Sequence, residues 1–148
     1  MDLESSPGLP FNGAEVEAHI GTGGVLYKKI GEGLYRSGRK VVLHLSERQI
    51  NGKSMKGYEL RDELTGKPVL NANELDALYD NPHLIPEDWK RDEKGNIRFI
   101  FFWGTIYRNP DTVNLYVRYL YFNVGTWNRF YNWLGNDWHG RSPAVLAS

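Results

Sequence analysis

Large apolar residues gather in three segments of the C-terminal half of the chain, and turn sequences separate these segments. Ile97 to Arg108 is a long apolar run, Leu115 to Phe122 sends successive side chains to opposite sides, and Thr126 to Leu134 is a third run. Asn109-Pro110-Asp111 and Asn123-Val124-Gly125 are typical of tight turns. The pattern predicts a three-stranded antiparallel meander from about residue 97 to 134.

One helix is predicted upstream of these strands, from Asn71 to Tyr79. Leu75 and Leu78 fall on one face of this segment, and an asparagine at its start can cap the first turn. Asn81-Pro82 is expected to end the helix. A meander packed against one or two helices defines an α+β fold.

The N-terminal half gives weaker signals. Residues 1–24 are polar and rich in Gly and Pro, which favours a flexible lead before a single domain over residues 25–148. Lys40 to Leu45 has the β-branched density of a strand, whereas Ser46 to Gln49 has the spacing of a capping box that would begin a short helix. The two interpretations compete, and we favour a strand that runs into a turn at Asn51-Gly52.

Composition narrows the classes of function. The 148 residues suit one domain, and 18 basic residues balance 18 acidic ones, so nucleic acid is an unlikely partner. The chain has no cysteine, which removes disulfides and thiol chemistry. It shows no apolar run long enough for a membrane span and no signal peptide. We expect a cytoplasmic protein, unless it is exported by another route or carried on a virion.

Two anomalies mark the last third of the chain. Fourteen of its 20 aromatic residues lie between Phe99 and Trp138, and no Lys, Glu, Gln or Met occurs after Lys94. A buried sheet accounts for many of the aromatic residues. It accounts less well for Asn128 to Asn132, where Asn, Arg and aromatic side chains mix as they do in the binding loops of antibodies.

The stretch from Trp127 to Ala144 resembles the variable proteins of diversity-generating retroelements, in particular those of uncultivated small-genome bacteria and archaea. Val69 to Ala72, Leu84 to Trp89 and Phe101 to Arg108 extend the resemblance, which ends at Ala147-Ser148 and covers about half the chain.

The resemblance implies a C-type lectin-like fold and a ligand surface that is rewritten by adenine-directed mutagenesis. Such mutagenesis starts largely from asparagine codons and does not reach Lys, Glu, Gln or Met. The absence of these four residue types is what it would leave behind. The variable region would span about residues 114–142. The positions expected to be rewritable are Asn123, Val124, Thr126, Asn128, Arg129, Phe130, Tyr131, Asn132, Gly135, Asn136, His139, Gly140 and Arg141. The positions expected to be fixed scaffold are Trp103, Trp127, Trp133, Leu134, Asp137, Trp138, Pro143 and Ala144.

The sequence departs from calcium-dependent sugar-binding lectins, because Asn136-Asp137-Trp138 has the wrong order and Asn109-Pro110-Asp111 precedes the wrong strand. Six or so oxygen ligands for calcium cannot be assembled. We therefore expect no metal and no cofactor, and a protein or glycan of unknown identity as ligand.

Three other functions stay open. An enzyme is disfavoured because the four histidines have no catalytic spacing, and His139 beside Asp137 fits a solvated turn better than an acid/base pair. A nucleic-acid module could stack bases on the aromatic strands beside Arg118 and Arg129, but the neutral charge opposes it. A fixed-partner or oligomer-forming domain would use the same aromatic residues as an interface.

Overall fold

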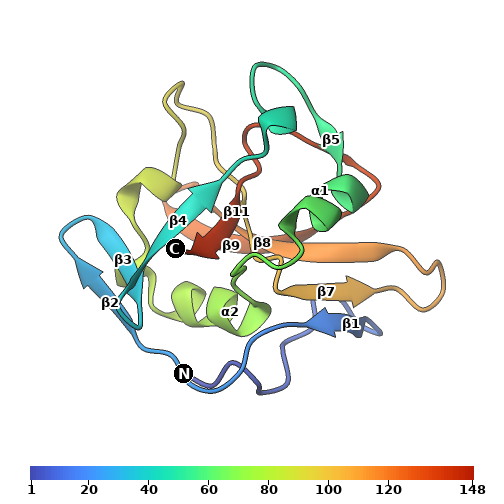
Figure 1. Cartoon of the computed structure of the whole chain (residues 1–148), viewed down its shortest axis with the longest axis horizontal. Helices are drawn as coiled ribbons and strands as arrows, with labels where there is room; N and C mark the ends of the chain where they lie inside the picture. The colour runs from blue at the N-terminus through green and yellow to red at the C-terminus, as the bar shows by residue number, and fades with distance from the viewer.

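The computed structural model describes residues 1–148 and shows an α+β fold, in which two α-helices pack against a nine-stranded mixed sheet (Figure 1). The strands are β1 Glu15–His19, β2 Tyr27–Ile30, β3 Gly33–Arg36, β4 Arg39–His44, β5 Met55–Lys56, β6 Ile100–Phe101, β7 Thr105–Arg108, β8 Leu115–Asn123, β9 Thr126–Trp133, β10 Asp137–Trp138 and β11 Ala144–Ala147. The helices are α1 Gly57–Leu64 and α2 Ala72–Asp80, with short 3₁₀ turns η1 Glu47–Gln49, η2 Pro82–Leu84 and η3 Glu87–Trp89.

The last strand of the chain lies in the middle of the sheet. β11 pairs antiparallel with β4 on one side and parallel with β6 on the other, and all four of its residues are buried. Beyond β4 come β3 and β2, and beyond β6 come β8, β7 and β1. β9 covers the remaining edge of β8, and β5 and β10 form a separate two-stranded sheet.

The predicted meander is confirmed in its second and third strands, β8 and β9, but its first strand is broken. β6 and β7 pair with opposite halves of β8 and are separated by three residues that end in Gly104. A Cβ on Gly104 would lie 2.8 Å from the backbone of Asn71, so the chain leading into α2 crosses at this point. The Gly104 N–H donates to the Leu70 carbonyl at 2.8 Å. An apolar run cannot reveal a crossing that depends on a distant segment.

The predicted helix is confirmed as α2. Asn71 accepts from the backbone N–H of Glu74, and Glu74 accepts in return from the N–H of Asn71, which completes a capping box. Asn81 is the C-cap. Leu75 and Leu78 are fully buried against the sheet. No helix of the protein has the length and apolar character needed to cross a membrane.

The sequence did not predict α1. Its first residue is Gly57, where a Cβ would come within 2.6 Å of the Leu134 carbonyl oxygen, so only glycine lets the helix start against the residue that follows β9. Leu60 and Leu64 then enter the core. The two interpretations of residues 40–49 prove compatible. β4 ends at His44, and Ser46 and Gln49 then form the capping box at the start of η1.

Residues 1–24 correct the expectation of a flexible lead. Strand β1 pairs with β7 from Glu15↔Arg108 to His19↔Thr105. Leu3 is only 2% exposed, and its carbonyl oxygen accepts from the side chains of Asn71 and Asn73. This segment passes under α2 and forms part of the domain.

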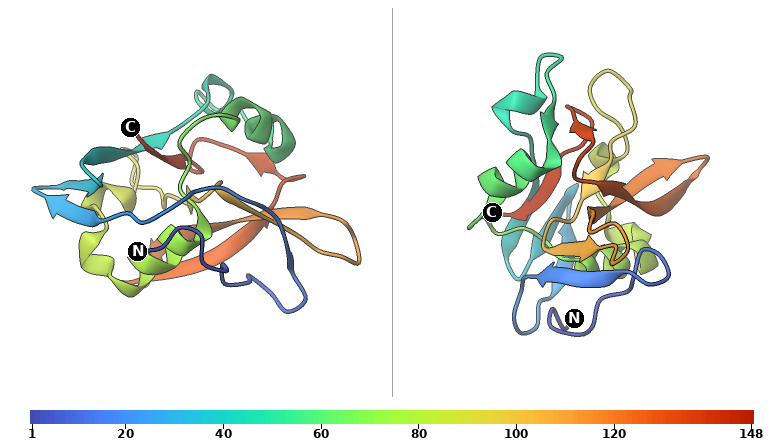
Figure 2. Two further views of the ribbon diagram at one scale, coloured as in Figure 1. Left: turned by 60° about the horizontal axis from the view of Figure 1, so that its bottom comes forward. Right: turned by 90° about the vertical axis from the view of Figure 1, so that its right-hand side faces the viewer.

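Two large apolar clusters form the core. One lies between α2, η3 and the sheet, and the other lies between α1, β10 and the sheet. In the right-hand view of Figure 2, β8 and β9 (orange) lie on the opposite side of the molecule from α1 (green). β9 pairs only with β8 and is therefore an outer strand of the sheet.

A buried carboxylate joins α2 to the strands at the other end of the sheet. Glu74 is fully buried, pairs with the Arg36 guanidinium at 2.8 Å and accepts a hydrogen bond from the Tyr27 hydroxyl. Burial, reinforced by the Glu74 charge, raises the pKa of Tyr27 far above its ordinary value. The charge of Glu74 is therefore paired and hydrogen-bonded, as a buried charge must be.

Candidate functional site

The β8–β9 hairpin holds most of the positions that the sequence singled out. Eight residue pairs run from Tyr116↔Trp133 to Asn123↔Thr126, and a two-residue turn of Val124 and Gly125 joins the strands. Both turn residues have positive φ, 53° and 74°. β9 pairs only with β8, so its outer edge and parts of both its faces meet solvent.

None of the thirteen positions expected to be rewritable is buried. Six are exposed, namely Val124, Thr126, Arg129, Phe130, Asn136 and Arg141, and the other seven are half-buried. Most of the expected scaffold is buried, namely Trp103, Trp127, Leu134, Trp138, Pro143 and Ala144. The boundary between the two groups therefore follows solvent exposure closely.

Two scaffold positions depart from this division. Trp133 is 37% exposed, which corrects the expectation that it is buried. Its ring covers Gly135, where a Cβ would fall 2.3 Å from the indole. Asp137 is exposed as well, and its carboxylate pairs with Lys56 at 2.9 Å. Alternation places Trp133 on the same side of β9 as the buried Trp127, but Trp133 is the last residue of the strand and is exposed there.

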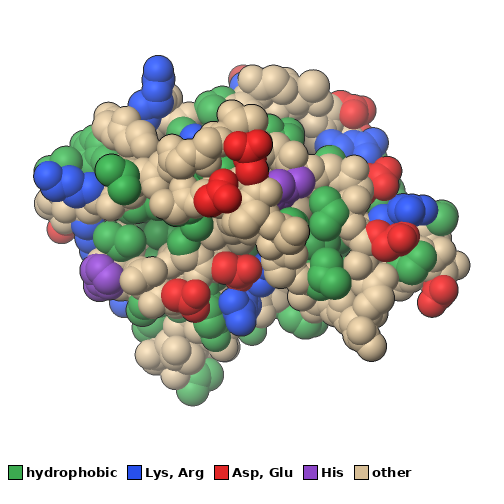
Figure 3. Space-filling model, turned by 90° about the horizontal axis from the view of Figure 1, so that it is seen from below, with side chains coloured by type: hydrophobic (Ala, Val, Ile, Leu, Met, Phe, Trp, Pro, Cys, Tyr) green, Lys and Arg blue, Asp and Glu red, His purple; other side chains and the backbone are tan.

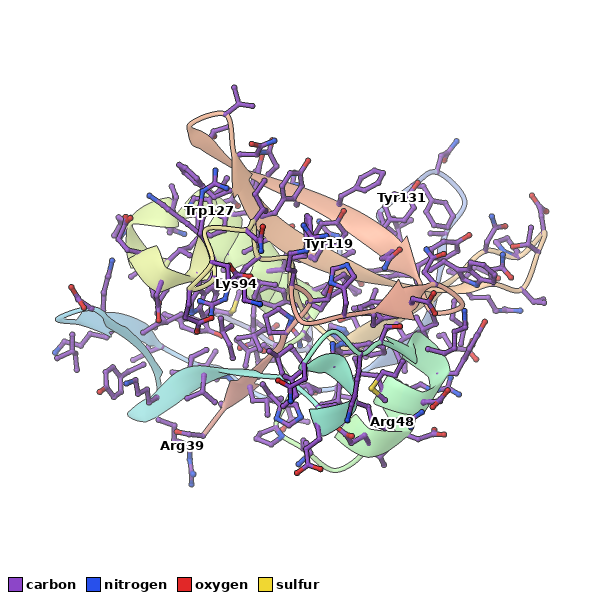
Figure 4. All side chains as sticks on the ribbon, turned by 90° about the horizontal axis from the view of Figure 1, so that it is seen from above. Arg39, Arg48, Lys94, Tyr119, Trp127 and Tyr131 are labelled. Carbon is purple, nitrogen blue, oxygen red and sulfur yellow. The ribbon has the colours of Figure 1, made fainter.

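One face of the hairpin is a cluster that we call the aromatic face, made of Phe99, Tyr119, Tyr121, Asn128, Phe130 and Asn132. Tyr119 is at its centre, with ring centroids 5.4 Å from Phe99 and 6.3 Å from Phe130. Figure 4 shows Tyr119 over the hairpin. Burial, with a smaller effect of Tyr121, raises the pKa of Tyr119 to about 12, so this phenol keeps its proton and can donate a hydrogen bond. The amides of Asn128 and Asn132 can both donate and accept.

A loop from Gly135 to Ser142 borders the aromatic face. The buried side-chain amide of Gln49 donates to the carbonyls of His139 at 3.1 Å and Ser142 at 3.0 Å, which fixes the loop from behind. The His139 Nδ1 accepts from the backbone N–H of Arg141 at 3.2 Å. Burial, and secondly the charge of Arg141, lower the pKa of His139, so the imidazole is neutral at pH 7.

The other face of the hairpin packs against α2 through a charged cluster. Asp76 accepts two hydrogen bonds from Arg118, at 2.9 and 3.1 Å, and a third from Arg129 at 2.8 Å. Arg118 is buried, whereas the Arg129 side chain is 42% exposed. Burial by itself would lower the pKa of Arg118. The hydrogen bonds to Asp76 and the attraction of its charge outweigh this effect, so the pKa of Arg118 is raised.

Sequence reasoning missed several residues that adjoin these surfaces. Tyr119 and Tyr121 could have been found, because pairing Asn123 with Thr126 across the predicted turn sets them opposite Phe130 and Asn128. Asp76 gave no such signal, since its contact with Arg118 spans 42 positions and depends on how α2 packs.

No family of known proteins, no characterised protein and no solved structure matches the chain. No three His, Asp or Glu side chains come together in an arrangement that could hold a metal ion.

Proposed function

We propose that this protein is a ligand-binding protein with a C-type lectin-like fold, that its C-terminal surface is diversified by a retroelement, and that it catalyses no reaction. One observation carries the proposal: the thirteen positions expected to be rewritable are all at least partly exposed, while six of the eight expected scaffold positions are buried. The two groups were separated by sequence resemblance, and their solvent exposure agrees with that separation at all but two positions.

The physical basis is that exposed residues away from special features change stability little, usually within about 0.5 kcal/mol. The buried tryptophans and Leu134 hold the hairpin, and the side chains between them can vary without opening the core. Rigid aromatic side chains supply contact area, and asparagines supply adaptable hydrogen bonds. Basic and acidic residues balance at 18 each, and both kinds are interspersed on the lower face of the molecule (Figure 3), which argues against a broad basic surface for nucleic acid.

The order of elements supports the lectin-like part of the proposal. A strand that precedes both helices, β4, pairs with the last strand, β11, so the two ends of this region meet. α1 and α2 lie between them in the chain, followed by β6, β8 and β9 as a hydrogen-bonded set. We take this pairing of an early strand with the last strand as support for a lectin-like fold.

The encoding DNA tests the proposal. We expect a near-copy of the segment that encodes residues 114–142, close to a reverse transcriptase gene, with differences only at adenine positions of the copy. Differences should coincide with the rewritable codons and spare those of Trp127, Leu134 and Trp138. A locus without such a copy, or one that differs equally at buried codons, contradicts diversification.

A fixed-partner or oligomer interface is the second candidate, because Phe130 is 53% exposed on the aromatic face. Light scattering of the purified protein separates the two. A monomer with this face free favours a ligand surface, whereas a dimer that Phe130→Ser dissociates favours a self-interface.

A further inference from the structure

A pocket opens where the hairpin, α2 and the N-terminal segment meet. Its volume is about 320 Å³, which exceeds the space of several water molecules. Its lining residues are Gly8, Leu9, Pro10, Asp76, Arg118, Arg129, Phe130 and Tyr131. Leu9, Pro10 and the two aromatic residues form apolar walls, so a polar group inside is partly shielded from water.

The charges in this pocket do not balance. Asp76 and Arg118 neutralise each other through two hydrogen bonds, and Arg129 adds a second positive charge to the same carboxylate. The three charged lining residues therefore sum to one positive charge. The chain as a whole is neutral, so this excess is local.

Arg129 also has donors to spare. A single nitrogen, Nη1, donates to Asp76 at 2.8 Å, and the guanidinium carbon lies over the Tyr79 ring, 4.1 Å from its centroid. The contact with Tyr79 restrains the side chain, and its 42% exposure leaves N–H donors accessible on a residue that lines the pocket. A planar, held guanidinium with free donors matches a carboxylate.

We propose that this pocket binds the carboxylate of an Asp or Glu side chain on a protein ligand, and that residue 129 sets the charge that the pocket accepts. Asp76 and Arg118 are fixed members, buried or half-buried in the fold, and position 129 is among those expected to vary. With Arg129 the lining carries one positive charge, with Asn it is neutral, and with Asp it carries one negative charge. The inference rests on the proposed binding function and names the ligand chemistry at one part of that surface.

A peptide library displayed without free C-termini tests the inference. The full chain is immobilised as wild type, Arg129→Asn and Arg129→Asp, after circular dichroism has shown that each is folded. We expect wild-type selection to enrich peptides with Asp or Glu, and Arg129→Asp to shift enrichment to Lys and Arg. A selected acidic peptide should lose about tenfold or more in affinity on Arg129→Asp, with Arg129→Asn between. Replacing its Asp or Glu by Asn or Gln should give a similar loss.

Arg39→Asp is the matched control. It makes the same change of net charge at an exposed arginine on β4, away from the hairpin (Figure 4), and should leave the acidic peptide bound. If peptides are enriched without acidic residues, or if acidic peptides bind Arg129→Asp as well as wild type, the inference is wrong and the binding function stands. If wild type enriches no peptide over the heat-unfolded protein, both fail.

Discussion

At the scale of single residues, the hairpin turn carries a conformational cost. Val124 has φ of 53° and is 91% exposed, so it gains no burial in return. A left-handed conformation costs an ordinary residue about 1–2 kcal/mol, and a two-residue turn of this kind favours Asn-Gly. Asparagine is also the residue from which adenine-directed replacement starts.

Val124→Asn should therefore stabilise the protein by about 1 kcal/mol, because Asn tolerates the left-handed region. Urea denaturation would measure the change in free energy of unfolding. Thr126→Asn, which introduces the same residue two positions later in β9, should give no such gain. A destabilised Val124→Asn protein would contradict this account of the turn.

The tryptophans of the hairpin region should differ in their importance. Trp138 is fully buried, with its ring 4.2 Å from Phe101, whereas Trp133 is 37% exposed. Trp138→Ala should cost about 3–5 kcal/mol, and Trp133→Ala about 1 kcal/mol. Thermal unfolding of the two variants measures this, and equal losses would mean that Trp133 is as well packed as Trp138.

His139 should make stability depend on pH. Its pKa in the folded protein is lowered, so the unfolded chain binds the proton more readily. The stability that neutral His139 contributes is fully present above the unfolded pKa of about 6.5. It is lost as the pH falls toward the lower pKa of the folded protein. His139→Asn should reduce the fall in melting temperature between about pH 7.5 and about pH 5. Wild type and variant losing stability in parallel would contradict this role.

At the scale of elements, Arg118 and Arg129 both donate hydrogen bonds to Asp76 of α2, but the two contacts should contribute unequally to stability. Asp76→Ala should destabilise the protein by about 3 kcal/mol, because it leaves the buried charge of Arg118 unpaired between α2 and β8. Arg129→Asn removes only a half-exposed ion pair and should cost about 0.5 kcal/mol or less. Chemical denaturation of both variants tests the contrast, which fails if the two losses are alike.

The elements that the sequence predicted are those with local signals. α2 has its capping residues and its apolar face within one segment. In the β8–β9 hairpin, the turn sequence directly joins the two segments of strand-forming residues. The elements that it missed depend on remote partners. α1 begins at a glycine that the close approach of Leu134 and Trp138 requires, and β1 becomes a strand only by pairing with β7. The break at Gly104 likewise exists because Asn71 crosses there.

At the scale of the whole molecule, the binding surface should be separable from the core. A combined Arg129→Asn, Phe130→Ser and Arg141→Ser variant should lose about 1 kcal/mol, or a few degrees in melting temperature, because all three side chains are exposed. Phe102→Ala should alone cost about 3–5 kcal/mol, since Phe102 is fully buried. If the surface variant unfolds like the core variant, the hairpin is structural and the proposed function loses its basis.

The same separation explains which parts of the site the sequence could indicate. The rewritable positions could be named in advance because the resemblance implied them, whereas alternation alone does not separate them, since Asn128 to Asn132 lie on both sides of β9. The partners across the pocket could not, because Gly8, Asp76 and Arg118 come from three segments that only the folded chain brings together.

The central place of β11 has a consequence for how faulty copies would be handled. Residues 144–147 join β4 to β6 and are translated after every codon expected to vary. A copy with a premature stop or a shifted reading frame in the variable segment would lack the strand that joins the two halves of the sheet. Such a chain would expose apolar surface and be open to proteolysis. Only chains that are translated in frame to the end of β11 would then fold and escape degradation.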